Sequence, residues 1–76
     1  MLELVEYMVR ALVDNPEDVK VNEVVGETVL IYEVGVADPD IGKVIGRNGR
    51  IANALRTIVQ AAAMKRDKKA TVEILS

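Results

Sequence analysis

The chain has 76 residues, of which 50% are hydrophobic and 29% are charged, and its net charge at neutral pH is -2. This length allows a single domain, so we expect one domain over residues 1–76. The chain has no Cys and no His, which removes disulfides, the usual metal ligands and the most common general base. We therefore expect a protein without catalytic activity, a metal site or a cofactor.

The first predicted element is an amphipathic helix over residues 2–14. Its apolar residues recur at helical spacing: Leu4, Val5, Met8, Val9, Leu12 and Val13. Asn15-Pro16 ends the helix, because the residue before a proline avoids helical backbone angles. The acidic start is unlike a signal peptide and no apolar run is long enough to span a membrane, so we expect a cytoplasmic protein that makes no membrane contact.

Two strands are predicted next, over residues 19–25 and 28–37, from their content of Val, Ile, Thr and Tyr. Gly26-Glu27 between them has the length and composition of a two-residue hairpin turn. Alternate residues of the second strand should face the core: Leu30, Tyr32, Val34 and Val36.

A short helix should follow, with Asp38 as its N-cap and Pro39 in its first turn. Asp40 is favourable at the positive end of this helix dipole. We expect the helix to carry three apolar side chains inward, Ile41, Val44 and Ile45, and to end at Gly46.

The next helix should begin at Asn48 or Gly49 and run to about Arg66. Its predicted core stripe consists of Ile51, Leu55, Ile58 and Ala62, and further apolar residues widen the apolar arc to about 200°. A stripe that faces one core needs only about 100°. Either the helix is simply rich in alanine, or a second face is buried in a homodimer through residues 50–66.

A basic loop, KRDKK over residues 65–69, leads to a last strand over residues 70–75. The resulting order is α-β-β-α-α-β. The hairpin makes the first two strands antiparallel, and the two-helix crossover brings the last strand in parallel. The expected fold class is α+β, a three-stranded mixed sheet with helices on one face.

The stretch GKVIGRNGR, residues 42–50, begins the basic half of the chain. Residues 1–41 contain ten acidic and two basic residues, a net charge of -8, whereas residues 42–76 contain eight basic and two acidic residues, a net charge of +6. Glycines permit close approach of another backbone, and the start of a helix attracts anions. Lys43, Arg47 and Arg50 surround this corner, which therefore favours phosphate groups.

Known phosphate-binding motifs do not fit this stretch. A P-loop needs Lys-Ser or Lys-Thr after its second glycine, and the dinucleotide fingerprint has a different glycine spacing. A lone G-x-x-G is most often a tight turn between helices, and the surrounding elements decide between the two interpretations. A strand, a helix, a G-x-x-G loop, a helix and a strand follow one another here, as in the KH nucleic-acid-binding module.

VIGRNGRIANAL, residues 44–55, resembles the KH core motif, and the preceding α-β-β resembles the type II arrangement of bacteria. The whole chain, including NPEDV and the block IGKVIGRNGRIANALRTIVQAAA, is similar to the KhpA family, small stand-alone (YlqC-like) KH proteins. The resemblance implies a non-catalytic protein that binds single-stranded RNA through the GXXG loop at residues 46–49.

The resemblance and the basic charges together define the candidate RNA-binding residues. They are Gly46, Arg47, Asn48 and Gly49 in the loop, Lys43 and Arg50 beside it, Ile45 and Ile51 at the floor of the groove, and Lys65, Arg66, Lys68 and Lys69 before the last strand. The isoleucines can equally serve as core residues.

The resemblance also implies partners and a physiological role. KhpA-type proteins form homodimers and pair with KhpB, a larger protein that also carries a KH domain. They are described as probable RNA chaperones linked to expression control, cell elongation, cell shape and peptidoglycan homeostasis in cell wall biogenesis. The alternative is a dimerisation or adaptor module with little affinity for RNA, in which the GXXG loop is only a turn.

Overall fold

In the computed structural model, which describes residues 1–75, six main elements follow in the predicted order. They are α1 (Leu2–Leu12), β1 (Lys20–Val25), β2 (Val29–Gly35), α2 (Ile41–Ile45), α3 (Arg50–Met64) and β3 (Lys69–Ile74). Three single 3-10 turns lie between them: η1 (Pro16–Asp18), η2 (Asp38–Asp40) and η3 (Arg47–Gly49). The predicted α-β-β-α-α-β order is confirmed, and Ser76 lies outside the described residues.

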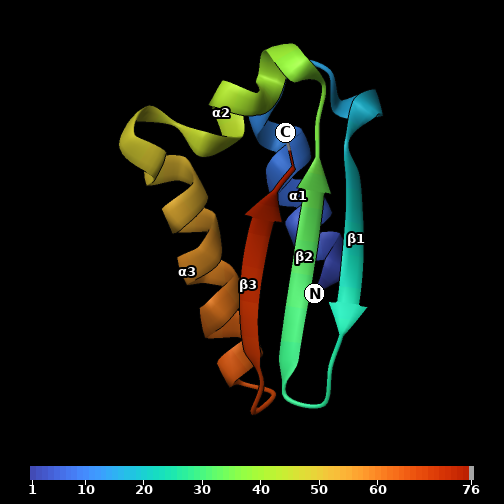
Figure 1. Ribbon diagram of the computed structural model, residues 1–76, viewed down its shortest axis with the longest axis vertical. Helices are drawn as coiled ribbons and strands as arrows, with labels where there is room; N and C mark the ends of the chain where they lie inside the picture. The colour runs from blue at the N-terminus through green and yellow to red at the C-terminus, as the bar shows by residue number, and fades with distance from the viewer. Residues whose placement is uncertain (76) are drawn as a thin grey trace.

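The three strands form one mixed sheet in the order β1-β2-β3 (Figure 1). β1 and β2 are antiparallel, with Val25 opposite Leu30, and β2 and β3 are parallel, with Tyr32 beside Val72. The α1 helix lies behind the strands in Figure 1, and α3 lies along β3. The prediction of a mixed sheet is therefore confirmed, and β3 is an edge strand of this sheet.

The β1–β2 hairpin turns one residue later than predicted. The Gly26 N–H donates to the Val29 carbonyl at 2.8 Å, so these two residues close the turn and Glu27 and Thr28 occupy its centre. The prediction of Gly26-Glu27 as the central pair was wrong, because Gly26 remains in the hydrogen-bonding pattern of the strands.

The core lies between the sheet and the helices. The inward positions of β2 are Leu30, Tyr32 and Val34, which are 5%, 0% and 0% exposed, as their alternation predicts. The Tyr32 hydroxyl donates to the Glu23 carboxylate of the opposite strand at 2.6 Å. Burial, together with this hydrogen bond, raises the pKa of Tyr32 above its ordinary value. The buried hydroxyl therefore stays protonated and keeps its acceptor.

The segment before α2 differs from the prediction. Ala37 is the residue before η2, and Asp38 makes no capping hydrogen bond with its side chain. Asp40 is instead fully buried, and its carboxylate accepts hydrogen bonds from the backbone N–H of Asp14 at 3.3 Å and of Asn15 at 3.0 Å, and from the Asn15 side chain at 3.1 Å. Asp40 thus joins the end of α1 to the beginning of α2.

The buried stripe of α3 is shifted from the predicted one. Its buried residues are Ala52, Leu55, Val59 and Ala63. Of the predicted stripe, only Leu55 is fully buried, and Ile58 is 47% exposed. Ile45 is also 37% exposed, so the prediction that it points into the core was wrong. Ile45 therefore lies at the surface next to the loop, and Ile58 lies at the surface between α1 and α3.

Candidate nucleic-acid interface

The GXXG loop has a backbone that only small residues adopt easily. Gly46 has φ 75° and ψ 174°, a region that is essentially restricted to glycine. A Cβ at this position would lie 2.7 Å from Cγ1 of Ile51. Asn48 and Gly49 have φ of 57° and 74°, the left-handed region that Asn and Gly tolerate best. The sequence RNG is therefore suited to this turn.

The loop leads directly into the N-terminus of α3. Gly49 precedes this helix and no side chain caps its first turn. The first N–H groups of a helix lack partners within the helix and carry its partial positive charge. The Gly49 N–H already donates to the Gly46 carbonyl and the Arg50 N–H to the Arg47 carbonyl. The N–H groups of the residues that follow, beside two glycines that carry no side chain, therefore form the surface that the backbone of a polyanion can approach closely.

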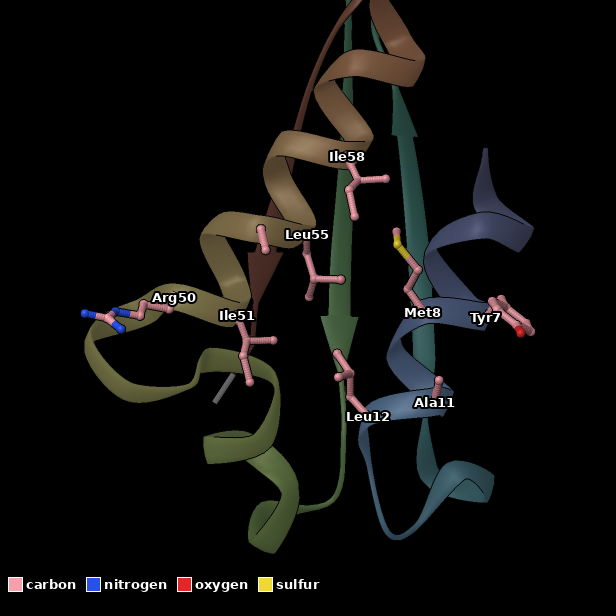
Figure 2. A pocket seen from close by; sticks show the side chains of 9 residues that line it. Tyr7, Met8, Ala11, Leu12, Arg50, Ile51, Leu55 and Ile58 are labelled. Atoms are coloured by element: carbon pink, nitrogen blue, oxygen red, sulfur yellow. The ribbon is translucent and has the colours of Figure 1, made fainter.

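Two of the predicted cations lie free at the loop. Arg47 and Arg50 are both exposed, and within residues 1–75 neither forms an ion pair. Figure 2 shows the Arg50 side chain directed away from the hollow between α1 and α3. Both guanidinium groups are therefore available to phosphate oxygens, for which their geometry is well suited.

Lys43 lies on α2 but its charge is already balanced. Its Nζ lies 2.9 Å from an Asp14 carboxylate oxygen and 3.6 Å from an Asp40 oxygen. The hydrogen bond to Asp14 and the charges of both carboxylates raise the pKa of Lys43. For Asp40, burial alone would raise the pKa, but hydrogen bonds from Asn15 and Asp14 and the Lys43 charge hold it below its ordinary value. The structure thus shows Lys43 in contact with Asp14 and Asp40.

The two apolar candidates, Ile45 and Ile51, both lie next to Gly46, the first glycine of the loop. Ile45 is the last residue of α2 and is 37% exposed, whereas Ile51 is partly buried and packs against Gly46. Ile51 also lines the hollow between α1 and α3. The loop therefore rests on a side chain that belongs to a second surface as well.

A polar row that the sequence analysis did not identify continues from the loop along α3. Gly49, Asn53 and Arg56 follow at spacings of four and three residues, which places them on one face of the helix. Arg56 Nε donates to the Val72 carbonyl of β3 at 3.0 Å, and Nη1 donates to Asn53 Oδ1 at 3.1 Å. The helical spacing after Gly49 was the signal in the sequence, but the contact with β3 was not visible there.

The basic loop at residues 65–69 lies at the opposite end of α3 (Figure 1). The 15 residues of α3 span about 22 Å, so the loop is well separated from Gly46–Gly49. Lys68 and Lys69 line a hollow of about 480 Å³ with Gln60 and Met64 on the β3 side of the helix. Lys65 and Arg66 line another hollow with Met1, Leu4, Ala61 and Ala62. The four cations therefore divide between two surfaces.

The hollow between α1 and α3 is apolar and has a volume of about 450 Å³. In Figure 2, Ile51, Leu55 and Ile58 on α3 face Met8 and Leu12 on α1 across it. Ala11 and Ala54 add small side chains to its walls. This surface, called the α1–α3 groove below, is distinct from the polar row.

Two other kinds of site are not found in residues 1–75. Their acidic side chains form no group of three or more that could hold a metal ion. None of their helices has the length and apolar character needed to cross a membrane. The GXXG loop, the polar row and the α1–α3 groove are thus the surfaces to be explained.

Comparison with known proteins identifies the family. The family model described as "KhpA/KhpB, KH domain" matches residues 2–74. The chain belongs to this family. It is 59% identical over 75 residues to the RNA-binding protein KhpA of Clostridium perfringens, a match that covers 99% of this chain and 100% of the relative. No solved structure matches it significantly.

More distant members of the KhpA/KhpB family match with similar coverage. The RNA-binding protein KhpA of Caldanaerobacter subterraneus is 55% identical, over 99% of this chain and 100% of the relative. The protein of the same name from Borreliella burgdorferi is 46% identical, over 97% of this chain and 90% of the relative. These relatives are named for RNA binding and not for a reaction, and the type II KH arrangement predicted from the sequence agrees with the family.

Proposed function

We propose that this KhpA/KhpB-family protein is a cytoplasmic, non-catalytic protein that binds single-stranded RNA through Gly46–Gly49. The observation that carries the proposal is the loop itself, a glycine-bounded turn at a helix N-terminus that no side chain caps. Arg47 within it and Arg50 beside it form no ion pair with any of residues 1–75. RNA phosphates would meet N–H groups and guanidinium groups there, and Gly46 and Gly49 carry no side chain that would block the approach of the RNA backbone.

The RNA would continue from the loop along the polar row of α3 toward Lys68 and Lys69. A KH module clamps about four nucleotides at its loop. Binding of this kind is weak and salt-dependent, with a slope of about -0.7 in log affinity against log salt for each phosphate contacted on a single strand. A pairing of modules would raise avidity.

The test is a titration of labelled single-stranded RNA at two salt concentrations with wild type and the Arg47→Asp/Asn48→Asp double variant. Asp tolerates the left-handed backbone of position 48, so the turn should persist. Loss of charge-assisted phosphate contacts should weaken binding by about tenfold or more.

The matched control is Arg10→Asp/Asn22→Asp, which makes the same two changes on exposed positions of α1 and β1. It should bind RNA like wild type. If both double variants bind as wild type does, the loop is not the clamp. If the control loses as much affinity as the loop variant, the effect is one of net charge.

The second candidate function is an adaptor with little affinity for RNA, and the α1–α3 groove favours it. Ile58 is 47% exposed on this groove although it is a large apolar residue. We propose a second copy of the chain as its occupant, because small residues on both helices allow another helix to approach closely. A KhpB-type protein, which also carries a KH domain, is the alternative partner.

The family resemblance extends the proposal to physiology. A role as an RNA chaperone in post-transcriptional regulation, with effects on cell elongation and peptidoglycan homeostasis, is consistent with a small module that binds RNA weakly and acts in pairs. The relatives are named for RNA binding alone, which supports the first part of this role.

A further inference from the structure

The polar row on α3 contains the guanidinium group of Arg56, which two hydrogen bonds hold in place and which remains partly exposed. We propose that Arg56 is the platform on which one nucleobase stacks when RNA passes from the GXXG loop along α3. This inference rests on the proposed RNA binding and adds to it a contact with a base, whereas the loop contacts phosphates.

The position of Arg56 follows from the helix. Asn53 lies one turn after Gly49, and a Cβ built on Gly49 would lie 4.0 Å from its Nδ2. Arg56 lies three residues further on the same face. An RNA strand clamped at the loop therefore meets Asn53 and then Arg56 as it follows the helix.

The orientation of the Arg56 side chain is fixed by two hydrogen bonds. Nε donates to the Val72 carbonyl at 3.0 Å and Nη1 to Asn53 Oδ1 at 3.1 Å. Val72 belongs to the edge strand β3, so Arg56 satisfies a carbonyl at the edge of the sheet. A guanidinium group that is ordered before binding loses less entropy when a base stacks on it.

Neither tyrosine of the chain can take this role. Tyr32 is 0% exposed, and Tyr7, although 75% exposed, lies on α1 at the α1–α3 groove. Single-stranded RNA is commonly recognised by stacking of its bases on aromatic rings or on arginine planes. Arg56 is partly exposed and, within residues 1–75, forms no ion pair, so its plane remains available.

Two variants of Arg56 separate stacking from charge and from structure. Arg56→Lys keeps the positive charge but loses the plane. Arg56→Gln places an amide N–H where Nε stands, so it can still donate to the Val72 carbonyl, but it loses the charge and most of the plane. Stacking predicts that both variants bind a short labelled single-stranded RNA more weakly, by about five- to tenfold, the lower part of the range for a stacked base.

The base is located by moving an abasic site through the same RNA. The affinity of wild type should fall about five- to tenfold when the base is missing at one particular nucleotide. Both Arg56 variants should be insensitive to base removal at that nucleotide and should respond like wild type elsewhere. Thermal unfolding of each variant shows whether the fold is kept. Arg10→Lys on α1 is the charge-conserving control for Arg56→Lys.

Several outcomes would overturn the inference. If Arg56→Lys binds like wild type and Arg56→Gln does not, the residue contributes only charge. If Arg56→Gln alone binds like wild type, the residue contributes only the bond to Val72. Equal losses on every abasic RNA would also exclude stacking. If the Arg47→Asp/Asn48→Asp variant loses binding but the Arg56 variants bind like wild type, the stacking inference is wrong and the proposed function stands. If wild type binds no RNA, both the proposed function and the stacking inference are wrong.

Discussion

The three glycines of GKVIGRNGR have different physical roles. Gly46 combines a backbone region restricted to glycine with a steric conflict against Ile51. Gly49 has φ 74°, but a Cβ there would meet only Asn53 Nδ2, at 4.0 Å, without a clash. Gly42 lies within α2 with no atom inside 4 Å of a built Cβ. Only at Gly46, therefore, do both the backbone conformation and the packing require glycine.

Alanine substitutions at these three positions should give three different stabilities. Gly46→Ala should lower the free energy of unfolding by about 2–3 kcal/mol, because alanine avoids this backbone region and its Cβ would clash with Ile51. Gly49→Ala should lower it by about 1 kcal/mol, because of left-handed strain alone. Gly42→Ala should raise it by about 0.5–1 kcal/mol, because alanine favours a helix interior. Urea unfolding followed by circular dichroism measures all three. Equal losses at Gly46 and Gly49 would contradict the steric conflict with Ile51.

The sequence could predict the loop residues but not all their neighbours. The G-x-x-G spacing and the basic residues identified Gly46 to Gly49, since glycine and asparagine report directly on the local backbone. Arg56 was missed because its partner, the Val72 carbonyl, is 16 residues away in sequence and is supplied by the edge of a sheet. Whether the predicted residues bind RNA stays a prediction.

At the scale of elements, one buried carboxylate links the end of α1 to the beginning of α2. Asp40 accepts hydrogen bonds from residues 25 and 26 positions earlier in the chain and pairs with Lys43. The sequence placed it only at the end of a helix dipole, since its true partners are backbone groups whose approach depends on the tertiary fold. The two helices are thus joined by polar contacts at the beginning of α2, whose other end leads into the GXXG loop.

Asp40→Asn should lower stability in a pH-dependent way. The folded-state pKa of Asp40 lies below its ordinary value of 3.8, so the ionised carboxylate stabilises the fold above that pH. This contribution should fade as the pH falls below 3.8 through the lowered pKa. Urea midpoints of wild type and variant should therefore differ by a constant amount near neutrality and converge in acid. A difference that grew with acidity would contradict this assignment.

The α3 helix shows why periodicity alone gave the wrong stripe. Its apolar residues cover about 200° of the circumference, so several stripes fit the pattern equally well. The residues of α3 that are buried are Ala52, Leu55, Val59 and Ala63. Other apolar residues of the helix, Ile51, Ala54 and Ile58, line one wall of the α1–α3 groove. The choice depends on which face meets β3, and that information lies outside the helix.

At the scale of the whole molecule, the element order and the mixed sheet followed from local patterns and the rule for crossover connections. The distance between the two basic segments could not be predicted from these local patterns. The 15 residues of α3 separate Arg47, which precedes this helix, from Lys68, which follows it. The predicted RNA-binding residues therefore separate into a group at the loop and four cations beyond α3, of which Lys68 and Lys69 lie on the β3 side, where an extended strand along α3 could reach them.

The α1–α3 groove predicts self-association through Ile58. Ile58→Glu places a charge on this apolar surface, and it should convert dimers to monomers without unfolding the domain, because the side chain is 47% exposed. Light scattering at high concentration measures the mass. The matched control is Thr57→Glu, since Thr57 is exposed on the same helix but does not line the groove. A mass unaffected by Ile58→Glu would exclude the groove as the contact between copies.

Ile51 packs against Gly46 and also lines the α1–α3 groove. A genetic screen for loss of RNA binding and a screen for loss of self-association would therefore both recover substitutions at this position. Such alleles would be pleiotropic, and they could not assign a phenotype to either activity. Separation-of-function alleles must come from residues that belong to one surface only, such as Arg47 for the loop and Ile58 for the groove.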